Sequence, residues 1–453
     1  MKIKINKRTG WRLINDKVVA FNCSNQKIVI WNETASAVWG KIVSGAKYSQ
    51  IVKWISNEYR IDAVTAKKDT DAFIYEAMQM GFIEINGQQI KNDGHSEYAS
   101  TETEGENVLL AIEMDAIKHL IPFAITFETT YACNEKCVHC YMGKRQFSLR
   151  LFEIKRILNE IAEEGCLFLS FTGGEFFMRK DAVEIIRHAS NLHFVIDILS
   201  NGTLISEEII TVLAKHSVRR VQISLYGANE KIHDFITLVP GSFRQSLKSI
   251  KNLKEAGIKV EIAFPMMRIN FDERYKVKKL TEKLGCMLSP SPIITARNNG
   301  SGDTFSLRLS DEQLEKFLAD DDFSSLYAGR KPFQDHQFYM GLSDISSAPP
   351  CYSGFNSCAI TPIGKVLPCN QFLYEVGDLK KDSFSVIWHK SKLLNSLRSL
   401  QIKDLVNCRK CKMLSLCARC PGLALLEGKG LLYSSPENCR ITSMLYKLKK
   451  ERR

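Results

Sequence analysis

Three cysteines in one short segment carry the most specific chemical signal of the chain. They follow the apolar run 123–130 as Cys133-x3-Cys137-x2-Cys140. Thiolates at such spacing bind zinc or iron–sulfur clusters. Structural zinc takes four protein ligands, whereas a four-iron cluster held by three thiolates leaves one iron open. No fourth cysteine is near, so the segment favours a cluster with an open iron over a zinc site or three unliganded thiols.

The composition places this chemistry in a reducing, soluble setting. The chain has 453 residues, enough for about three domains, and 14 cysteines, eight of them between Cys351 and Cys439. It has no membrane-length apolar run, and its polar N-terminus has no signal sequence, so we expect it in the cytoplasm, where cysteines bind metals or do redox chemistry. The net charge of +12 admits nucleic acid, an anionic membrane or an acidic peptide as partner, and does not choose among them.

From residue 123 onward, apolar runs alternate with amphipathic stretches. The predicted strands are 123–130, 167–171, 194–199, 221–225 and 259–264, with 292–296 as a candidate sixth. This alternation predicts an α/β domain with a parallel sheet, open or closed into a barrel. Chemistry on such sheets lies at the carboxyl ends of the strands. The residues found there are Gly173, Gly174, Glu175, Ser200, Asn201 and Ser224. The two glycines allow a close backbone approach to a ligand.

Together these motifs resemble the radical S-adenosylmethionine (radical SAM) superfamily, whose fold is a partial (β/α)6 TIM-like barrel, here residues 121–300. The resemblance implies that Cys133, Cys137 and Cys140 hold a [4Fe–4S] cluster whose open iron chelates SAM. It implies Glu175, in the Gly173-Gly174-Glu175 segment, as acceptor of the SAM amino group, with Ser200, Asn201 and Ser224 around the ribose and carboxylate. His139 would lie beside the adenine, and a surface or supporting role for it remains open.

The C-terminal cysteines resemble the SPASM domain, here residues 346–445, which carries two auxiliary [4Fe–4S] clusters. By that resemblance Cys351, Cys369 and Cys420 hold cluster I. Cluster II would take Cys408, Cys411, Cys417 and Cys439. Only two residues separate Cys417 from Cys420, where the family often has three, which puts the sharing of ligands in doubt. A pair of zinc knuckles is the alternative.

Cys358 is a candidate fourth ligand of cluster I. Residues 359–367 predict a hairpin that turns at 362–364, and Cys358 then lies opposite Cys369 or Pro368, depending on whether Gly364 forms a bulge. In the first register Cys358 shares a face with Cys369. In the second it points away and cluster I keeps an open iron, the arrangement we favour.

Residues 1–90 predict a separate winged-helix α+β domain with strands at 11–14, 18–21 and 27–31, three helices, and a return strand at 82–85. It resembles the peptide-recognition domain of the PqqD family, in which a leader peptide adds to the edge of the third strand. A winged-helix nucleic-acid binder or a plain structural domain is the alternative. We expect a linker at 91–120, a connecting segment at 301–345 and a basic tail at 446–453.

This domain order implies a radical SAM maturase of a ribosomally synthesised precursor peptide. We expect thioether bonds from cysteine sulfur to carbon, with carbon–carbon crosslinking as the alternative. A non-catalytic iron–sulfur or nucleic-acid-binding protein is the alternative from another class. The expected partners are a leader-bearing precursor peptide and an electron donor such as flavodoxin or ferredoxin, and we expect neither nucleic acid nor membrane.

Overall fold

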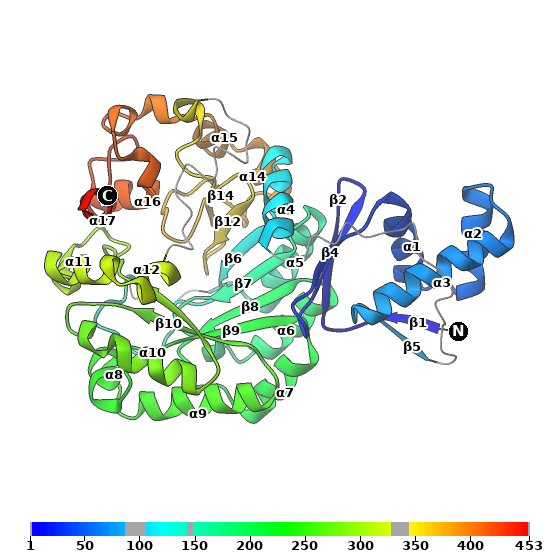
Figure 1. The fold of residues 1–453 in the computed structure, drawn as a ribbon, viewed down its shortest axis with the longest axis horizontal. Coiled ribbons are helices and arrows are strands. Elements are labelled where there is room, and N and C mark those ends of the chain that lie inside the picture. The colour runs from blue at the N-terminus through cyan, green and yellow to red at the C-terminus, as the bar shows by residue number, and fades with distance from the viewer. Residues whose placement is uncertain (1, 87–105, 143–147, 328–343, 452–453) are drawn as a thin grey trace.

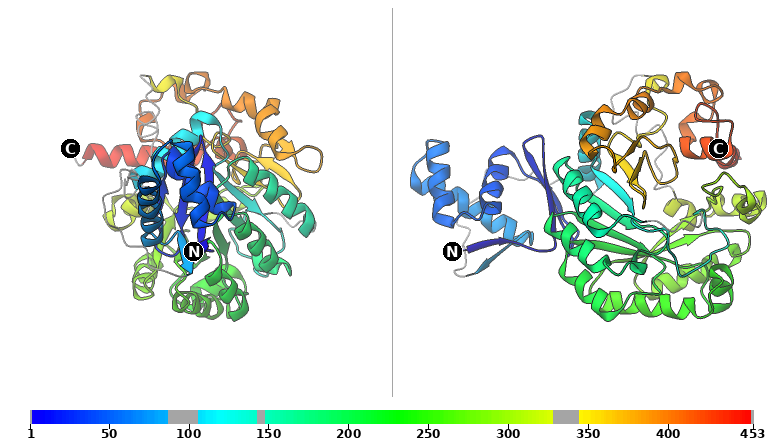
Figure 2. Two further views of the ribbon diagram at one scale, coloured as in Figure 1. Left: turned by 90° about the vertical axis from the view of Figure 1, so that its right-hand side faces the viewer. Right: turned by 180° about the vertical axis from the view of Figure 1, so that it is seen from behind.

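The computed structural model describes residues 2–86, 106–142, 148–327 and 344–451. An N-terminal domain lies at one end of the long axis, a parallel-sheet barrel is central, and the cysteine-rich C-terminal region covers one side of the barrel (Figures 1 and 2). This is the α/β architecture with two flanking domains that the sequence predicts. Among the described residues, no helix combines the length and apolar character needed to cross a lipid bilayer.

The N-terminal domain contains the three predicted strands as an antiparallel sheet. These are β2 (Thr9–Ile14), β3 (Lys17–Asn22) and β4 (Ile28–Ile30). Its helices are α1 (Glu33–Val43), α2 (Tyr48–Glu58) and α3 (Ala63–Gln79). A two-residue turn joins β2 to β3, and both Asn15 and Asp16 have positive φ, as such hairpins require. The return strand β5 (Ile83–Asn86) pairs with β1 (Lys2–Ile5), which local sequence did not reveal.

The barrel sheet is parallel from β6 to β11. Its strands are β6 (Ala124–Glu128), β7 (Phe168–Thr172), β8 (Val195–Ser200), β9 (Val218–Ser224), β10 (Val260–Pro265) and β11 (Met287–Ser291). The outer layer consists of α5 (Leu151–Glu163), α6 (Ala182–Asn191), α7 (Glu207–Lys215), α8 (Glu230–Thr237), α9 (Ser242–Glu255) and α10 (Arg274–Lys283). The candidate sixth strand at 292–296 was wrong. Pairing with β10 selects the preceding residues, and Pro290 is tolerated because β11 lies at the sheet edge.

The C-terminal region continues the same sheet. Strand β12 (Ser357–Ile360) pairs parallel with β6, and β13 (Lys365–Leu367) and β14 (Gly377–Asp378) complete a nine-stranded sheet. Its helices are α14 (Phe384–Lys390), α15 (Lys392–Arg398), α16 (Pro421–Glu427) and α17 (Pro436–Glu451). Helices α11 (Asp311–Ala319) and α12 (Asp321–Tyr327) precede it, within the expected connecting segment. The expected basic tail is largely the end of α17.

The linker predicted at 91–120 was wrong in its second half. Helix α4 (Glu106–His119) occupies it, while residues 91–105 lie outside the described part. Val108, Ile112 and Ala116 pack against the N-terminal sheet and the strand starts, and Leu110, Met114 and Ile117 pack against Tyr352 and Phe355. Two apolar stripes on one helix therefore connect all three domains. The polar stretch before the helix obscured this pattern.

The N-terminal sheet is docked on the barrel at the amino ends of the strands. The amide of Trp11 donates to the carbonyl of His193 at 3.0 Å, just before β8. Arg8 donates to the carbonyl of Val218, the first residue of β9, and Cys23 donates to that of Ser217 just before it. Phe21 and Val19 share an apolar cluster with Phe123, which precedes β6. The recognition domain therefore sits at the end of the barrel opposite the polar carboxyl-end residues (Figure 1).

Candidate active site

The loop bearing Cys133, Cys137 and Cys140 follows β6 and is held by the Gly-Gly segment after β7. The amide of Gly174 donates to the carbonyl of Thr130, and that of Glu175 donates to the carbonyl of Ala132, both at 2.8 Å. A Cβ at Gly173 or Gly174 would lie 2.3 Å from one of these carbonyl oxygens. The sequence led us to expect that the glycines make room for a ligand. In the structure they make room for the backbone of the cysteine loop.

Glu175 is fully buried and its carboxylate is surrounded by donors. The Ser200 hydroxyl lies 2.9 and 3.0 Å from the two carboxylate oxygens, and the amides of Asn201 and Phe177 donate at 2.7 and 3.0 Å. An ionised carboxylate has about four lone-pair sites, and a hydroxyl has one proton to donate, so these three donors occupy about three of them. Burial raises the Glu175 pKa, while the hydrogen bonds oppose this shift. Glu175 therefore joins the ends of β7 and β8, and its contact with the SAM amino group stays a prediction.

Asn201 extends this network to the cysteine loop. Its side-chain amide donates to the side-chain oxygen of Asn134 at 2.9 Å, and the side-chain amide of Asn134 donates to Thr203 at 2.7 Å. Asn134 directly follows Cys133. The structure thus places Asn201, and through Glu175 also Ser200, beside the part of the loop that bears Cys133.

The fourth strand reaches the site through Tyr226. The side chain of Ser224 is hydrogen-bonded to Tyr226, whose hydroxyl lies 3.9 Å from the Cys137 sulfur. The Tyr226 ring packs edge-on against His139, with centroids 4.9 Å apart. Burial lowers the pKa of His139 to about 4, so the ring is neutral at pH 7. His139 is half-buried beside the loop, and its Nδ1 atom has no hydrogen-bond partner among the described residues.

One buried acid in the barrel escaped the sequence analysis. Glu128 ends β6 and accepts a 3.3 Å hydrogen bond from the hydroxyl of Tyr141, which is also hydrogen-bonded to the side chain of Asn370. Burial raises the pKa of Glu128 to about 7. Asn370 directly follows Cys369, so these contacts link the barrel to the C-terminal cysteines. The sequence does carry one indication of Glu128, because it is the single acid in an otherwise apolar predicted strand.

The C-terminal cysteines lie near one another in two groups. Burial and the neighbouring thiols of Cys351 and Cys420 raise the pKa of Cys369 to about 12. These three cysteines line a cavity of about 1150 Å³, whose far wall is α4. Burial, with the thiols of Cys439, Cys408 and Cys411, raises the pKa of Cys417 to about 11. Each group is therefore close in space despite long sequence separations.

Cys358 belongs to neither group. A three-residue loop with Gly364 at φ +85° sets the hairpin register, which pairs Ala359 with Leu367. One residue further, Cys358 lies opposite Pro368. Its thiol is buried in the barrel core, and the groups that act on its raised pKa, after burial, are Cys166 and Arg398. The structure therefore has the second of the two registers that the sequence left open.

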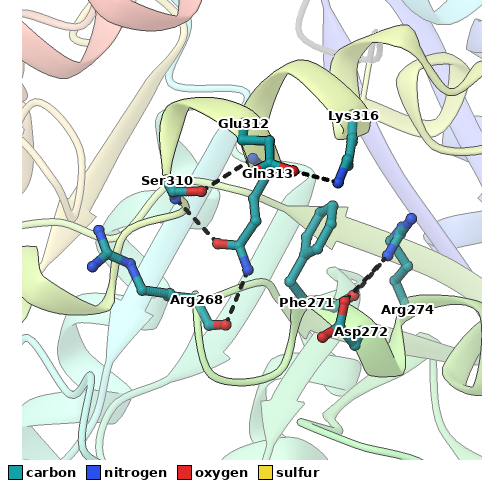
Figure 3. A pocket seen from close by; sticks show the side chains of 8 residues that line it. All are labelled: Arg268, Phe271, Asp272, Arg274, Ser310, Glu312, Gln313 and Lys316. Carbon is teal, nitrogen blue, oxygen red and sulfur yellow. Dashed lines mark hydrogen bonds and ion pairs between the residues drawn. The ribbon is translucent and has the colours of Figure 1, made fainter.

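A smaller cavity of about 480 Å³ lies outside the barrel, between the start of α10 and that of α11 (Figure 3). Its charges pair with one another: Lys316 with Glu312 at 2.6 Å and Arg274 with Asp272 at 4.0 Å. Ser310 accepts from the amide of Gln313 and caps α11. No residue of the predicted site lines this cavity, so we leave it outside the candidate site.

Three family models match separate parts of the chain. The radical SAM superfamily matches residues 127–280, the iron-sulfur cluster-binding SPASM domain matches 351–421, and coenzyme PQQ synthesis protein D (PqqD) matches 17–83. The mycofactocin maturase MftC of Mycobacterium tuberculosis is 30% identical over 295 residues, covering 62% of this chain and 73% of MftC. This chain belongs to the radical SAM/SPASM family of peptide maturases.

Two further comparisons bear on this radical SAM/SPASM maturase. The AdoMet-dependent heme synthase of Methanosarcina barkeri is 25% identical over 335 residues, covering 70% of this chain and 95% of that protein. The crystal structure of Streptococcus suis SuiB bound to precursor peptide SuiA superposes with a TM-score of 0.60 at 17% identity, covering 97% of this chain and all of SuiB. The second likeness concerns the fold.

Membership of this family makes the chain a radical SAM enzyme with a SAM-binding [4Fe–4S] cluster, auxiliary clusters and SAM as cofactors. The PqqD-like domain supports a precursor peptide as partner. Two of the alternatives considered from the sequence, a pair of zinc knuckles and a non-catalytic protein, are thereby set aside.

The cysteine environments fit these cofactors. Burial raises the pKa of Cys133 to about 11, and Glu135 and Cys140 are among the groups that further oppose ionisation of Cys137. Iron would supply the positive charge that these thiols need. Within the described ranges, no three His, Cys, Asp or Glu side chains converge on a single metal ion. A four-iron cluster binds its thiolates on different irons, so its ligands need not converge in that way.

Proposed function

We propose that this enzyme forms thioether crosslinks between cysteine sulfur and carbon in a ribosomally made precursor peptide. The observation that carries the proposal is that the Cys358 side chain points into the barrel core, away from the other cysteines. Because its thiol lies in the barrel core, three cysteines remain for cluster I, namely Cys351, Cys369 and Cys420. Three ligands would leave one coordination position for a thiolate of the peptide. The cavity beside them supports this, because it extends beyond the three thiols to α4.

At the carboxyl ends of the barrel strands, the cofactors would supply the radical and the protein side chains would hold and shield them. When bound, the SAM-binding cluster and SAM supply a 5′-deoxyadenosyl radical that removes a hydrogen atom from the peptide. Cys133, Cys137 and Cys140 would hold that cluster. Ser200, Asn201 and Ser224 would surround SAM, with Glu175 fixing the first two and His139 beside the adenine. The apolar layer of Tyr226, Met267 and Ile294 would keep water from the radical.

The leader of the precursor would bind the edge of β4. Hydrogen bonds from Asn22 to Lys27 and from Trp31 to Val18 flank the β3–β4 ladder. Alternation then turns the amides of Ile28 and Ile30 to the outer edge, and neither amide donates a hydrogen bond to another described residue. An added strand would pair with these amides. An outside flavodoxin or ferredoxin would deliver the electron.

The test uses the anaerobically reconstituted enzyme, SAM, a reductant and a short cysteine-containing peptide taken from an open reading frame that neighbours the gene of this chain. We expect 5′-deoxyadenosine and a peptide that has lost two hydrogen atoms and one alkylatable thiol per crosslink. Loss of hydrogen with every thiol still alkylated would establish the carbon–carbon alternative. Absence of peptide modification while SAM is cleaved would refute the assignment of the substrate.

The leader site has its own test. Ile28→Pro removes one outward amide and, as an edge position, spares the β3–β4 ladder. We expect about tenfold weaker binding of a fluorescent leader peptide, with unchanged SAM cleavage. Ile28→Val keeps the amide and should bind like the wild type. Equal binding by both variants would exclude the β4 edge.

A further inference from the structure

The surface around the second group of auxiliary cysteines has an exposed apolar centre. Val406, Leu432 and Tyr433 expose 45%, 37% and 36% of their surface. The amide of Val406 donates to the carbonyl of Leu432 at 3.0 Å, so the centre joins two loops. Cys439 is also exposed, and its thiol is hydrogen-bonded to Ser434, next to Tyr433. A candidate cluster ligand therefore reaches solvent beside an apolar patch.

Cations border this patch. Arg409 and Lys410 lie between Cys408 and Cys411, Lys412 follows Cys411, and Lys429 lies in the other loop, all exposed. We call these four side chains the cationic rim. Within the described part of the chain, these four side chains form no ion pair or hydrogen bond. Asp404 is an exposed acid of the same segment.

The other nearby acids do not neutralise the rim. Glu427 and Glu437 are buried and paired with arginines. Glu427 lies 2.7 Å from Arg308, and Glu437 lies 2.7 Å from Arg440. The positive field of the rim is therefore directed to solvent, where it can act on an approaching protein.

We propose that this surface docks an acidic one-electron carrier protein, so that electrons enter the enzyme through the cluster held by Cys408, Cys411, Cys417 and Cys439. The inference rests on the proposed function for that cluster. One electron passes from the reduced carrier to the cluster, which oxidises the carrier by one electron and makes or breaks no bond. A small apolar centre with a charged rim suits a transient complex that is steered by charge and then released.

The position of this surface leaves the peptide path open. In Figures 1 and 2 the C-terminal end of the chain and the N-terminal domain lie at opposite ends of the long axis. A carrier on the rim would therefore not cover the β4 edge. Carrier and precursor can bind at the same time.

The test measures binding of a bacterial flavodoxin to the reconstituted enzyme by biolayer interferometry. We expect binding that weakens at least about tenfold from low to physiological ionic strength. The variant Arg409→Glu/Lys410→Glu/Lys412→Glu should bind at least about tenfold more weakly at low salt. Lys248→Glu/Lys251→Glu/Lys283→Glu makes the same change in net charge on α9 and α10 and should bind like the wild type.

Two further measurements separate docking from folding and from the proposed function. Iron content, and SAM cleavage driven by photoreduced deazariboflavin, should match the wild type in both variants, whereas reduction by flavodoxin should slow only in the rim variant. Equal flavodoxin binding by rim variant and wild type, or equal loss in the control variant, would overturn the proposal. Loss of leader-peptide binding in the rim variant, with flavodoxin binding kept, would assign the rim to the peptide instead.

Discussion

The backbone amide of Asn201 donates a 2.7 Å hydrogen bond to the buried carboxylate of Glu175. This contact joins the end of β8 to the segment after β7, and the amide of Glu175 in turn donates to Ala132, next to Cys133. Three strand ends therefore share one buried acid. We call these hydrogen bonds of Glu175 the Glu175 bracket. The shape of the site depends on them, so Glu175 is the first residue to test.

Glu175→Gln should weaken both folding and SAM binding. The glutamine amide would face donors from Ser200, Asn201 and Phe177, leaving at least one buried donor unpaired at a cost of about 1–3 kcal/mol. Urea denaturation of the metal-free protein measures the first effect, and calorimetry with SAM on the reconstituted enzyme measures the second. Ser200→Ala removes a single donor and should cost less, about 1 kcal/mol. Equal stability of Glu175→Gln and wild type would contradict the bracket.

Gly174→Ala should displace the cysteine loop. Its Cβ would lie 2.3 Å from the carbonyl oxygen of Ala132, so backbone must move. We expect a loss of iron at the SAM-binding cluster, measured as iron per chain and by electron paramagnetic resonance after reduction with SAM present. Gly40→Ala, whose Cβ meets nothing within 4 Å in helix α1, is the control and should keep full iron. The prediction fails if the two variants load iron alike.

Cys358→Ala should leave every cluster in place, because the thiol lies among core residues and not with Cys351, Cys369 and Cys420. Iron content and the spectrum of cluster I should match the wild type. Cys369→Ala, in contrast, should lose cluster I. A loss of iron in Cys358→Ala comparable to that in Cys369→Ala would show that the cluster draws Cys358 out of the core.

Glu128→Gln should change how stability depends on pH. Burial raises the pKa of Glu128 from 4.5 to about 7, so the folded protein binds this proton more tightly than the unfolded chain. The stabilisation is complete below about pH 4.5 and is lost as the pH rises to about 7. The glutamine variant avoids this loss, and its advantage over the wild type should grow from pH 5 to pH 8, up to on the order of 3 kcal/mol.

Urea denaturation of the metal-free protein across this pH range measures the effect of Glu128→Gln. Glu153 offers a control of opposite sign, because the hydrogen bond from the amide of Arg150 lowers its pKa. The stability that this carboxylate adds is complete above its unfolded pKa of about 4.5, so Glu153→Gln should run parallel to the wild type from pH 5 to pH 8. Parallel pH profiles for Glu128→Gln and wild type would rule out an ionised Glu128 as a source of instability.

Local sequence was sufficient for most of the fold, whereas the grouping of the C-terminal cysteines was implied by the resemblance to the SPASM domain. Periodicity predicted β6 to β10 within a few residues, and the Asn32 cap of α1 is present, with its side chain accepting from Ala35 at 2.9 Å. These features depend on residues near one another in the chain, where alternation and capping chemistry act directly.

The features that the sequence did not predict depend on contacts with residues far along the chain. Strand β1 forms because β5 pairs with it, and β11 is placed by β10 rather than by its own composition. Helix α4 was hidden because its two apolar stripes serve different domains. The two registers of the Cys358 hairpin differ by one residue, and the conformation of Gly364 decides between them. The pKa of Glu128 is raised by burial, which no local sequence pattern encodes.

The docking of the N-terminal domain at the amino ends of the strands sets a length requirement on the substrate. Strand β8 has six residues, so the two ends of the barrel are separated by about 20 Å at 3.3 Å per residue. A peptide anchored at β4 must span at least this depth before its first modified residue arrives at the cysteines. We therefore expect the enzyme to select the modified residue by its distance from the anchored leader, and to leave closer residues unmodified however reactive they are.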